Sequence, residues 1–180
     1  LARADSLITD SEHIRRELIE HFCVREERVR AIHLGAASCF APRTAEQTAQ
    51  VLDKHQLCHG QYLLFVGTLE PRKGIDTLLR AWSSLPVSLT QAFPLVVAGA
   101  PGWGNDTTLA TIAKLKQSRG LRHLNFVSSA DLPELYAGAR AFVYPSHYEG
   151  FGLPILEAMS SGVPVICTHG TSMCEITGDT

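Results

Sequence analysis

The sequence lacks the features that mark membrane-spanning and nucleic-acid-binding proteins. Over its 180 residues, no apolar run approaches the roughly 20 residues that a membrane-spanning helix needs. The formal net charge is −2, so the chain does not have the strong positive field that attracts nucleic-acid phosphates. We therefore predict no membrane span and no nucleic-acid partner.

The cysteine and histidine patterns of metal centres and disulfide frameworks are also missing. The five cysteines, at positions 23, 39, 58, 167 and 174, are odd in number and form no Cys-x-x-Cys pair. The histidines at 33, 55, 59 and 123 have no ligand-like spacing with acids or cysteines. We expect buried or incidental thiols in a reducing cytosol, and no metal or other cofactor.

Short apolar strands alternate with helical segments along the chain, which has the length of one well-packed domain. The expected strands lie at 6–9, 29–34, 62–66, 95–98, 124–127, 141–144 and 163–167. The expected helices begin after Ser11 and run at about 44–55, 75–84, 107–118, 131–137 (capped by Asp131) and 154–162. This alternation predicts an α/β fold, with a parallel sheet covered by helices on both faces.

Three polar, glycine-bearing loops follow strands of the predicted sheet: Gly67–Gly74, Gly99–Asn105 and Ser146–Gly152. In open parallel sheets, ligands bind beyond the carboxyl ends of the strands, where the strand order switches. The alternation therefore predicts a binding site at this edge of the sheet.

The first of these loops carries two adjacent cations, Arg72 and Lys73, directly before a glycine and a helix start. Free N–H groups at a helix N-terminus favour anions. Arginine can fork onto two oxygens, and lysine acts as a point charge. A solvated basic turn is the alternative, but the position at the ligand edge favours a phosphate or diphosphate site. The second loop places its glycines at 99, 102 and 104, which does not fit the dinucleotide fingerprint, so we expect a flexible connection and no NAD.

The third loop leads into a helix and brings two acids, Glu149 and Glu157, eight residues apart. A retaining glycosidase needs its two carboxyl groups about 5–5.5 Å apart, whereas eight residues of continuous helix span roughly 12 Å. The spacing therefore does not indicate an acid–base dyad. We interpret the two acids as separate hydrogen-bond acceptors on one hydroxyl-rich ligand. For Glu157 an ordinary dipole-stabilising role stays open, and for His147 substrate contact and simple packing are both open.

These segments resemble a known family. Gly67-Thr-Leu-Glu-Pro-Arg-Lys-Gly74, Glu149-Gly-Phe-Gly-Leu-Pro-Ile-Leu-Glu157 and Gly162-Val-Pro-Val are similar to the retaining glycosyltransferases of the GT-B fold, family 4 (glycosyl transferases group 1). The resemblance implies two Rossmann-like domains facing a cleft, of which the C-terminal one binds a nucleotide-sugar donor. It assigns residues 1–40 to the end of the N-terminal domain and the linker, and 41–180 to a donor domain truncated at its C-terminus.

The resemblance also implies roles for individual residues. Lys73 and Arg72 would bind the donor diphosphate, and Glu149 would contact the sugar near the reacting carbon; these three are the predicted catalytic residues. Glu157 would hold the ribose. The predicted donor-binding set is completed by Gly67, Thr68, Val127, Gly152 and Leu153, with Val127 near the base and the N–H groups of Gly152 and Leu153 on sugar or phosphate oxygens.

One position departs from the family pattern. Many members have arginine where this chain has Thr68, and threonine cannot neutralise a diphosphate, so more of that work falls to Arg72 and Lys73. The variant motif resembles enzymes of O-antigen and other cell-surface polysaccharide synthesis, often mannosyltransferases.

The resemblance implies a longer cytoplasmic enzyme that takes a GDP- or UDP-linked sugar, and leaves open a place at the inner face of the membrane. Its acceptor, a saccharide or lipid-linked hydroxyl, would bind a domain preceding Leu1, and we expect the 180-residue piece to bind donor without transferring it. The alternatives are a non-catalytic nucleotide- or sugar-binding module and, among enzymes, an epimerase or a phosphorylase. No motif here indicates the pyridoxal-binding lysine of a phosphorylase.

Overall fold

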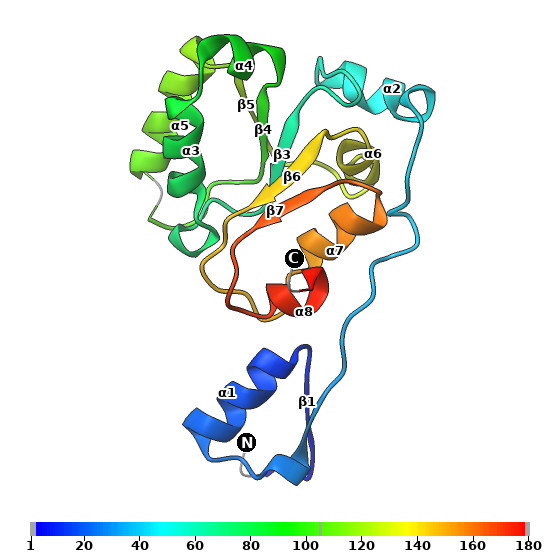
Figure 1. The fold of residues 1–180 in the computed structure, drawn as a ribbon, viewed down its shortest axis with the longest axis vertical. Helices are drawn as coiled ribbons and strands as arrows, with labels where there is room; N and C mark the ends of the chain where they lie inside the picture. The colour runs from blue at the N-terminus through cyan, green and yellow to red at the C-terminus, as the bar shows by residue number, and fades with distance from the viewer. Residues whose placement is uncertain (1–2, 105, 179–180) are drawn as a thin grey trace.

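The computed structural model describes residues 3–104 and 106–178; Asn105 of the predicted loop Gly99–Asn105, and the last two residues of the predicted donor domain, lie outside them. A small N-terminal unit is joined to a larger α/β domain by an extended segment (Figure 1). The small unit contains β1 (Leu7–Thr9), α1 (Glu12–Phe22), the 3-10 turn η1 (Glu26–Arg28) and β2 (Val29–Ala31). The strands of the larger domain are β3 (Leu63–Val66), β4 (Leu95–Ala98), β5 (Leu121–Asn125), β6 (Ala141–Tyr144) and β7 (Val165–Cys167). Its helices are α2 (Ala45–Lys54), α3 (Ile75–Ser84), α4 (Val87–Ala92), α5 (Asp106–Ser118), α6 (Leu132–Ala137), α7 (Leu153–Ser160) and α8 (Met173–Thr177), with the 3-10 turn η2 (Pro71–Lys73).

The five strands of the larger domain form one parallel sheet in the order β5-β4-β3-β6-β7. The chain starts in the middle with β3, adds β4 and β5 on one side, and then crosses back to add β6 and β7 on the other. The strand order therefore switches between β3 and β6, which is where open parallel sheets bind their ligands.

The two directions of travel place helices on opposite faces of the sheet. Parallel crossovers are almost always right-handed, so connections that move toward β5 cover one face and those that move toward β7 cover the other. Figure 1 shows α3, α4 and α5 on one side of the strands and α2, α6 and α7 on the other. The predicted α/β fold, with helices on both faces of a parallel sheet, is confirmed.

The core lies between the sheet and these helices. Inward-facing residues of β3, β4 and β6 are completely buried, as are helix residues such as Leu79 and Leu135. Aromatic rings continue this packing on β6, where Phe142 lies 5.6 Å from Tyr144 and 5.3 Å from Tyr136, measured between ring centroids. Central strands covered on both faces explain the near-continuous apolar runs of the sequence.

Several details of the predicted elements are wrong. The strand expected at 124–127 is β5, which begins at Leu121 and ends at Asn125 because Asn125 has a left-handed φ of 52°. Asp131 precedes α6 but its side chain does not cap it; the carboxylate lies 3.1 Å from Lys54 Nζ instead. The strands expected at 29–34 and 163–167 are shorter: the first ends at Ala31 and the second begins at Val165. The short helices α4 and α8 were not predicted.

The small unit is a parallel pair, β1 with β2, against which α1 lies. Ser11 begins α1 as predicted, because its hydroxyl accepts a hydrogen bond from the backbone N–H of Ile14 at 3.2 Å. Phe22, on the predicted apolar face of α1, is 63% exposed, since a two-stranded sheet is too small to cover the helix.

Candidate functional site

The centre of the candidate site is a buried ion pair across the strand switch. Lys73 comes from the end of η2 after β3, and Glu149 comes from the loop after β6. Lys73 Nζ donates to Glu149 Oε1 at 2.7 Å, and the two residues are only 9% and 8% exposed. The alternation of strands and helices thus brings together two residues that are 76 positions apart.

The Glu149 carboxylate is held by more than the lysine. Its Oε1 also accepts hydrogen bonds from the hydroxyls of Tyr144 (2.9 Å) and Ser146 (2.7 Å). Lys73 Nζ donates to Tyr144 Oη at 2.6 Å and lies 5.2 Å from the centre of that ring. Two of the three ammonium donors are therefore used, which leaves one that can reach a ligand.

Arg72 completes this cation–carboxylate cluster, the name used below for Arg72, Lys73 and Glu149. Its Nη1 lies 3.2 Å from Glu149 Oε2, and its Nε donates to Glu70 Oε2 at 3.1 Å. The Arg72 side chain is 45% exposed, against 11% for Lys73. Arg72 is thus the cation that an incoming anion can reach first.

The environment keeps the Glu149 carboxylate ionised. Burial acts to raise the pKa of Glu149, but the hydrogen bonds from Lys73, Ser146 and Tyr144 and the lysine charge outweigh it, so this pKa lies below its ordinary value. Burial and the Glu149 charge both raise the pKa of Tyr144. The tyrosine therefore stays neutral and donates to the carboxylate.

Backbone contacts lock the two loops together. Arg72 O accepts a hydrogen bond from the His147 N–H at 2.8 Å, and Ser146 Oγ, whose proton goes to Glu149, lies 3.0 Å from the same oxygen. Gly74, with a left-handed φ of 67°, lies so close to the other loop that a Cβ atom there would be 1.9 Å from Pro145 O. Only glycine fits this approach, which explains the glycine at the end of the Pro-Arg-Lys-Gly sequence. The His147 side chain is exposed.

Three predicted donor-binding residues line a second part of the edge. A cavity of about 230 Å³ opens beyond the carboxyl ends of β3, β4 and β5, and its lining includes Gly67, Thr68, Val127 and Phe126. The loop after β4 is joined to the loop after β3 rather than being a free connection: Leu69 N donates to Ala100 O at 3.0 Å. The cavity offers mostly backbone and apolar groups, as a flat heterocycle requires.

The remaining predicted residues lie at the start of α7. Gly152 precedes the helix with a φ of 114°, and Leu153 is its first residue, so the N–H groups at this end have no partner inside the helix. Glu157 is half-buried on α7, and burial raises its pKa above its ordinary value. The Tyr136 hydroxyl lies close to Glu157 without making a hydrogen bond of normal geometry.

The sequence reading missed two members of this site, Tyr144 and Ser146. Tyr144 ends a strand that the sequence predicts as a buried apolar run, and such a run does not indicate what the tyrosine hydroxyl contacts. Ser146 could have been predicted as a site residue, because it is the first residue of a loop already predicted to face the ligand. In the described residues there is no group of three histidine, cysteine or acidic side chains placed to hold a metal ion.

This fold is that of a glycosyltransferase family. Residues 53–180 match the family model Glycosyl transferases group 1, and the chain belongs to this family. The chain is 43% identical over 179 residues to O-antigen chain mannosyltransferase B of Escherichia coli, covering 99% of this chain and 47% of that protein. It is 34% identical over 183 residues to the serotype-specific mannosyltransferase WbdA of E. coli, covering 98% of this chain and 22% of that one. The chain thus spans about half or less of the length of these relatives.

Solved structures show the same fold. WaaG, described as a glycosyltransferase involved in lipopolysaccharide biosynthesis, superposes with a TM-score of 0.82 at 24% identity, over 97% of this chain and 47% of WaaG. Anabaena HepE in complex with UDP and glucose gives 0.81 at 21% identity, over 96% of this chain and 46% of HepE. The family predicted from the motifs is confirmed. No helix in the described part of the chain is long and apolar enough to cross a membrane.

Proposed function

We propose that this chain is the donor-binding part of a retaining glycosyltransferase that moves mannose from a nucleotide sugar to an acceptor hydroxyl. The observation that carries the proposal is the cation–carboxylate cluster, which lies at the strand switch of a sheet whose family transfers sugars. The mannose and a polysaccharide acceptor are supported by the 43% identity to an O-antigen mannosyltransferase. In this proposal the acceptor binds elsewhere in the whole enzyme.

The cations would act on the diphosphate. Arg72, the exposed member of the cluster, would fork onto two phosphate oxygens, and the remaining donor of Lys73 would reach a third. As the bond between the sugar carbon and the diphosphate breaks, negative charge grows on the phosphate oxygens, where these cations and the N-terminus of α7 stabilise it. No metal is needed in this proposal.

Glu149 would bind the sugar of the donor. Its carboxylate is ionised, with three donors on Oε1 and, among the described residues, only Arg72 Nη1 on Oε2, so Oε2 is the atom that would accept a further hydrogen bond from a sugar hydroxyl. The acceptor hydroxyl would attack on the face that the diphosphate leaves, which retains the configuration. The departing phosphate oxygen would take the proton of the acceptor hydroxyl as the new glycosidic bond forms.

The remaining predicted contacts would hold the nucleoside. Glu157 would accept hydrogen bonds from the ribose hydroxyls, and the cavity lined by Gly67, Thr68 and Val127 would hold the base. HepE structures contain UDP or UDP-glucose, and we propose either UDP or GDP as the nucleotide of this chain. The five cysteines are free thiols, which supports a cytoplasmic location, where the enzyme could also meet a membrane-bound acceptor.

A thermal-shift screen with UDP, GDP, ADP and their sugars tests the proposal on this chain. A ligand at 100 times its Kd stabilises a protein by about 2.7 kcal/mol, which corresponds to a rise of about 5 °C or more in Tm for a domain of this size. We expect such a shift with one nucleoside diphosphate and little with pyrophosphate alone. If none of the nucleotides raised Tm, the donor site would be refuted.

A non-catalytic binding module would give the same shift, so a second measurement separates it from an enzyme. The whole protein is assayed for consumption of the nucleotide sugar selected by the screen. Release of nucleoside diphosphate together with a new glycosidic product supports the transferase, whereas binding without consumption supports the module.

Replacing Glu157 with glutamine is expected to change stability and affinity in opposite directions. The fold raises the pKa of Glu157, so the charged form is disfavoured at neutral pH and Glu157→Gln should add about 0.5 kcal/mol to the unfolding free energy at pH 7. This gain should disappear as the pH falls below the ordinary carboxyl pKa, where the wild-type side chain is protonated in both states. Nucleotide affinity should fall about tenfold, because a charged acceptor for the ribose is lost.

The matched control is Glu46→Gln, at an exposed position in the first turn of α2. It should leave nucleotide affinity unchanged. A Glu157→Gln variant that gained stability and kept its affinity would remove Glu157 from the donor site and leave it as a surface acid.

A further inference from the structure

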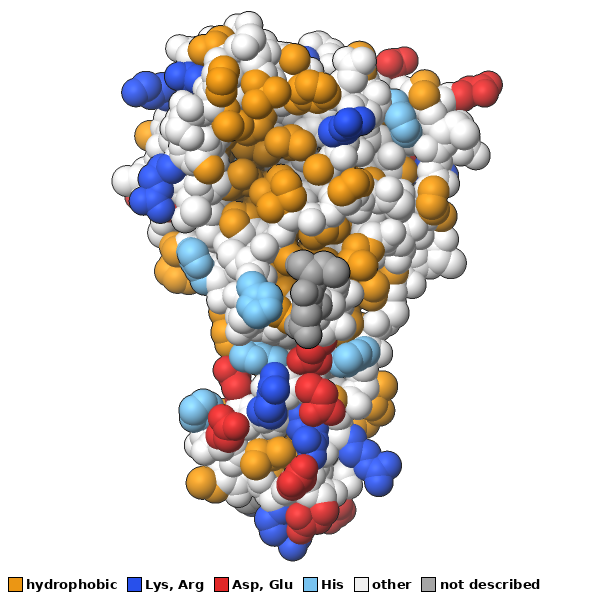
Figure 2. Space-filling model, viewed as in Figure 1, with side chains coloured by type: hydrophobic (Ala, Val, Ile, Leu, Met, Phe, Trp, Pro, Cys, Tyr) orange, Lys and Arg blue, Asp and Glu red, His pale blue; other side chains and the backbone are white. Residues whose placement is uncertain are grey.

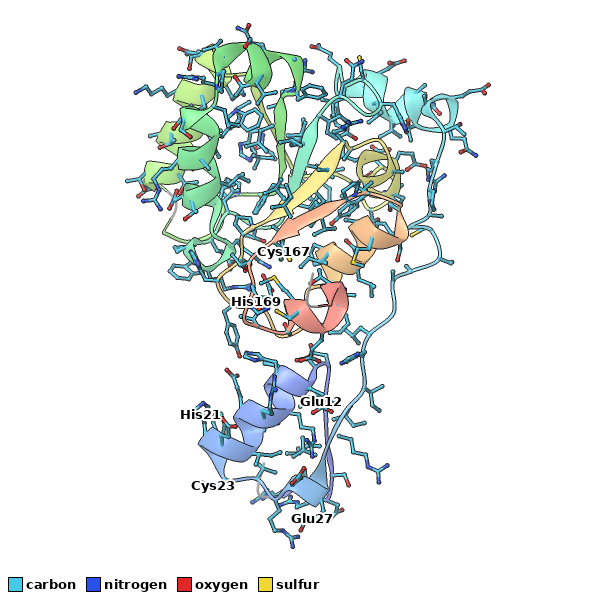
Figure 3. The ribbon with its side chains drawn as sticks, in the orientation of Figure 1. Glu12, His21, Cys23, Glu27, Cys167 and His169 are labelled. Carbon is cyan, nitrogen blue, oxygen red and sulfur yellow. The ribbon has the colours of Figure 1, made fainter. Side chains whose placement is uncertain are left out.

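The contact between the small N-terminal unit and the α/β domain is built on one carboxylate, that of Glu175 on α8. Its two oxygens accept hydrogen bonds from the backbone N–H groups of Glu12 (2.8 Å) and His13 (2.7 Å), the first two residues of α1. Figure 3 shows Glu12 at the end of α1 that faces α8, with His21 and Cys23 at the far end. Glu175 therefore caps a helix whose first two residues lie 163 and 162 positions away in the chain.

The same carboxylate also reaches the segment that leaves the small unit. His33 Nε2 lies 2.8 Å from Glu175 Oε2, just after β2. Burial acts to raise the pKa of Glu175, but the two backbone N–H groups and His33 outweigh it, so this pKa lies below its ordinary value. One ionised side chain thus holds both segments by which the small unit meets the rest of the protein. Histidine and acidic side chains gather at this narrow waist in Figure 2.

The loop that carries Glu149 is part of the same junction. Ser11 Oγ donates to Gly150 O at 2.5 Å, and Tyr148 Oη donates to Glu17 Oε2 at 2.5 Å. The rings of His13 and Tyr148 lie 5.8 Å apart between centroids, and those of His33 and Phe151 lie 5.7 Å apart. The residues on both sides of Glu149 therefore contact the small unit.

The loop is fixed from the other side by the residues before Glu175. Ser172, completely buried at the start of α8, has its hydroxyl oxygen 2.7 Å from Glu149 O and 3.0 Å from Phe151 O, so its one proton is shared between these two carbonyl oxygens. The loop is thus held between α8 and α1, and Glu175 is the side chain that joins those two helices directly. A movement of α1 would be transmitted to Glu149 through its chain neighbours Tyr148 and Gly150, which contact the small unit.

From these contacts we propose that Glu175 is a positioning residue, which couples the small N-terminal unit to the loop that carries Glu149. The effect of this coupling on sugar transfer rests on the proposed function. With the coupling intact, the small N-terminal unit and the Glu149 carboxylate keep a fixed position relative to each other. The coupling itself is a property of the folded chain and is measured without any reaction.

Hydrogen exchange on this chain tests the coupling. In Glu175→Ala the amides of Glu12 and His13 lose their acceptors and should exchange about tenfold faster, and amides of the 148–151 loop should exchange about threefold faster. Glu175→Gln keeps the volume but has one acceptor oxygen in place of two, so it should also show faster exchange at Glu12 or His13. The control Asp131→Ala removes the exposed ion pair with Lys54 and should leave both segments unchanged.

The outcomes separate the coupling from simple packing and from the proposed reaction. If Glu175→Gln exchanged like the wild type in both segments, the carboxylate would only fill space and the proposal would be wrong. Unchanged exchange of the 148–151 loop in Glu175→Ala would refute it as well. In the whole enzyme, Glu175→Gln should lower kcat while nucleotide Kd changes less than about twofold, since the phosphate-binding cations are untouched. A protein without transferase activity would still give the exchange result.

Discussion

Replacing Lys73 with alanine is expected to lower the turnover of the whole enzyme at least tenfold. Lys73 lies 2.7 Å from Glu149 Oε1 and is the most buried cation of the cluster. Without it, the diphosphate loses one stabilising charge and the Glu149 carboxylate loses its closest partner, a buried pair whose rupture typically costs about 3–5 kcal/mol of stability. Because Arg72 still contacts Glu149, we expect a loss of stability at or below the lower end of that range. The measurements are initial rates of donor consumption and a urea unfolding curve.

Two further variants keep this result interpretable. Lys73→Met retains the aliphatic stem and the packing against Tyr144. If this variant folds but has low turnover, the loss is caused by the missing charge and not by a damaged core. Lys116→Ala removes a positive charge from an exposed position on α5 and should react at the wild-type rate. Near-normal turnover of a well-folded Lys73→Met enzyme would refute the phosphate-binding role of Lys73.

Replacing Gly74 with alanine should destabilise this chain by about 3 kcal/mol. A left-handed conformation costs a non-glycine residue about 1–2 kcal/mol, and overpacking typically costs about 1–3 kcal/mol more. At Gly74 both apply, because the φ is 67° and the new Cβ would lie 1.9 Å from Pro145 O. The loops after β3 and β6 would have to separate, which would pull Lys73 away from Glu149. Denaturant unfolding gives the loss of stability, and nucleotide titration gives the expected loss of affinity.

Gly60 supplies the matched control. Its φ of 72° is nearly the same, but a Cβ there would meet no atom within 4 Å. Gly60→Ala should therefore cost only about 1 kcal/mol and leave nucleotide affinity unchanged. Equal losses for the two variants would mean that the close approach of the two loops adds nothing to stability.

The sequence was sufficient for the fold class and for placing three of the predicted site residues at one edge of the sheet. Alternating strands and helices predicted a parallel sheet, and the loops 67–74 and 146–152 fell at its carboxyl edge, where the structure brings Arg72, Lys73 and Glu149 together. Periodicity reports burial, however, and not what a buried polar atom contacts. For that reason Tyr144 read as a core residue, and the end of β5 at Asn125, set by its left-handed backbone, was missed.

Contacts between distant segments were beyond a single sequence. Glu175 has no local motif, and its partners on α1 lie at the other end of the chain. The same holds for Asp131, whose expected cap was replaced by an ion pair with Lys54 from α2. In both cases tertiary contacts decided which of several possible partners a carboxylate took. The roles assigned to Glu157, Gly152, Leu153 and Val127 stay predictions until the experiments above are made.

The arrangement of Glu149 between two cations has a consequence for ligand selection. Arg72 and Lys73 are balanced by Glu149 and Glu70, so the site presents no surplus positive charge when it is empty. A small anion such as free phosphate would have to compete with carboxylates that are already in place, and it brings no sugar or nucleoside contacts to offset that competition. If the proposed function holds, a ligand that engages several parts of the site at once should therefore bind in preference to a small anion.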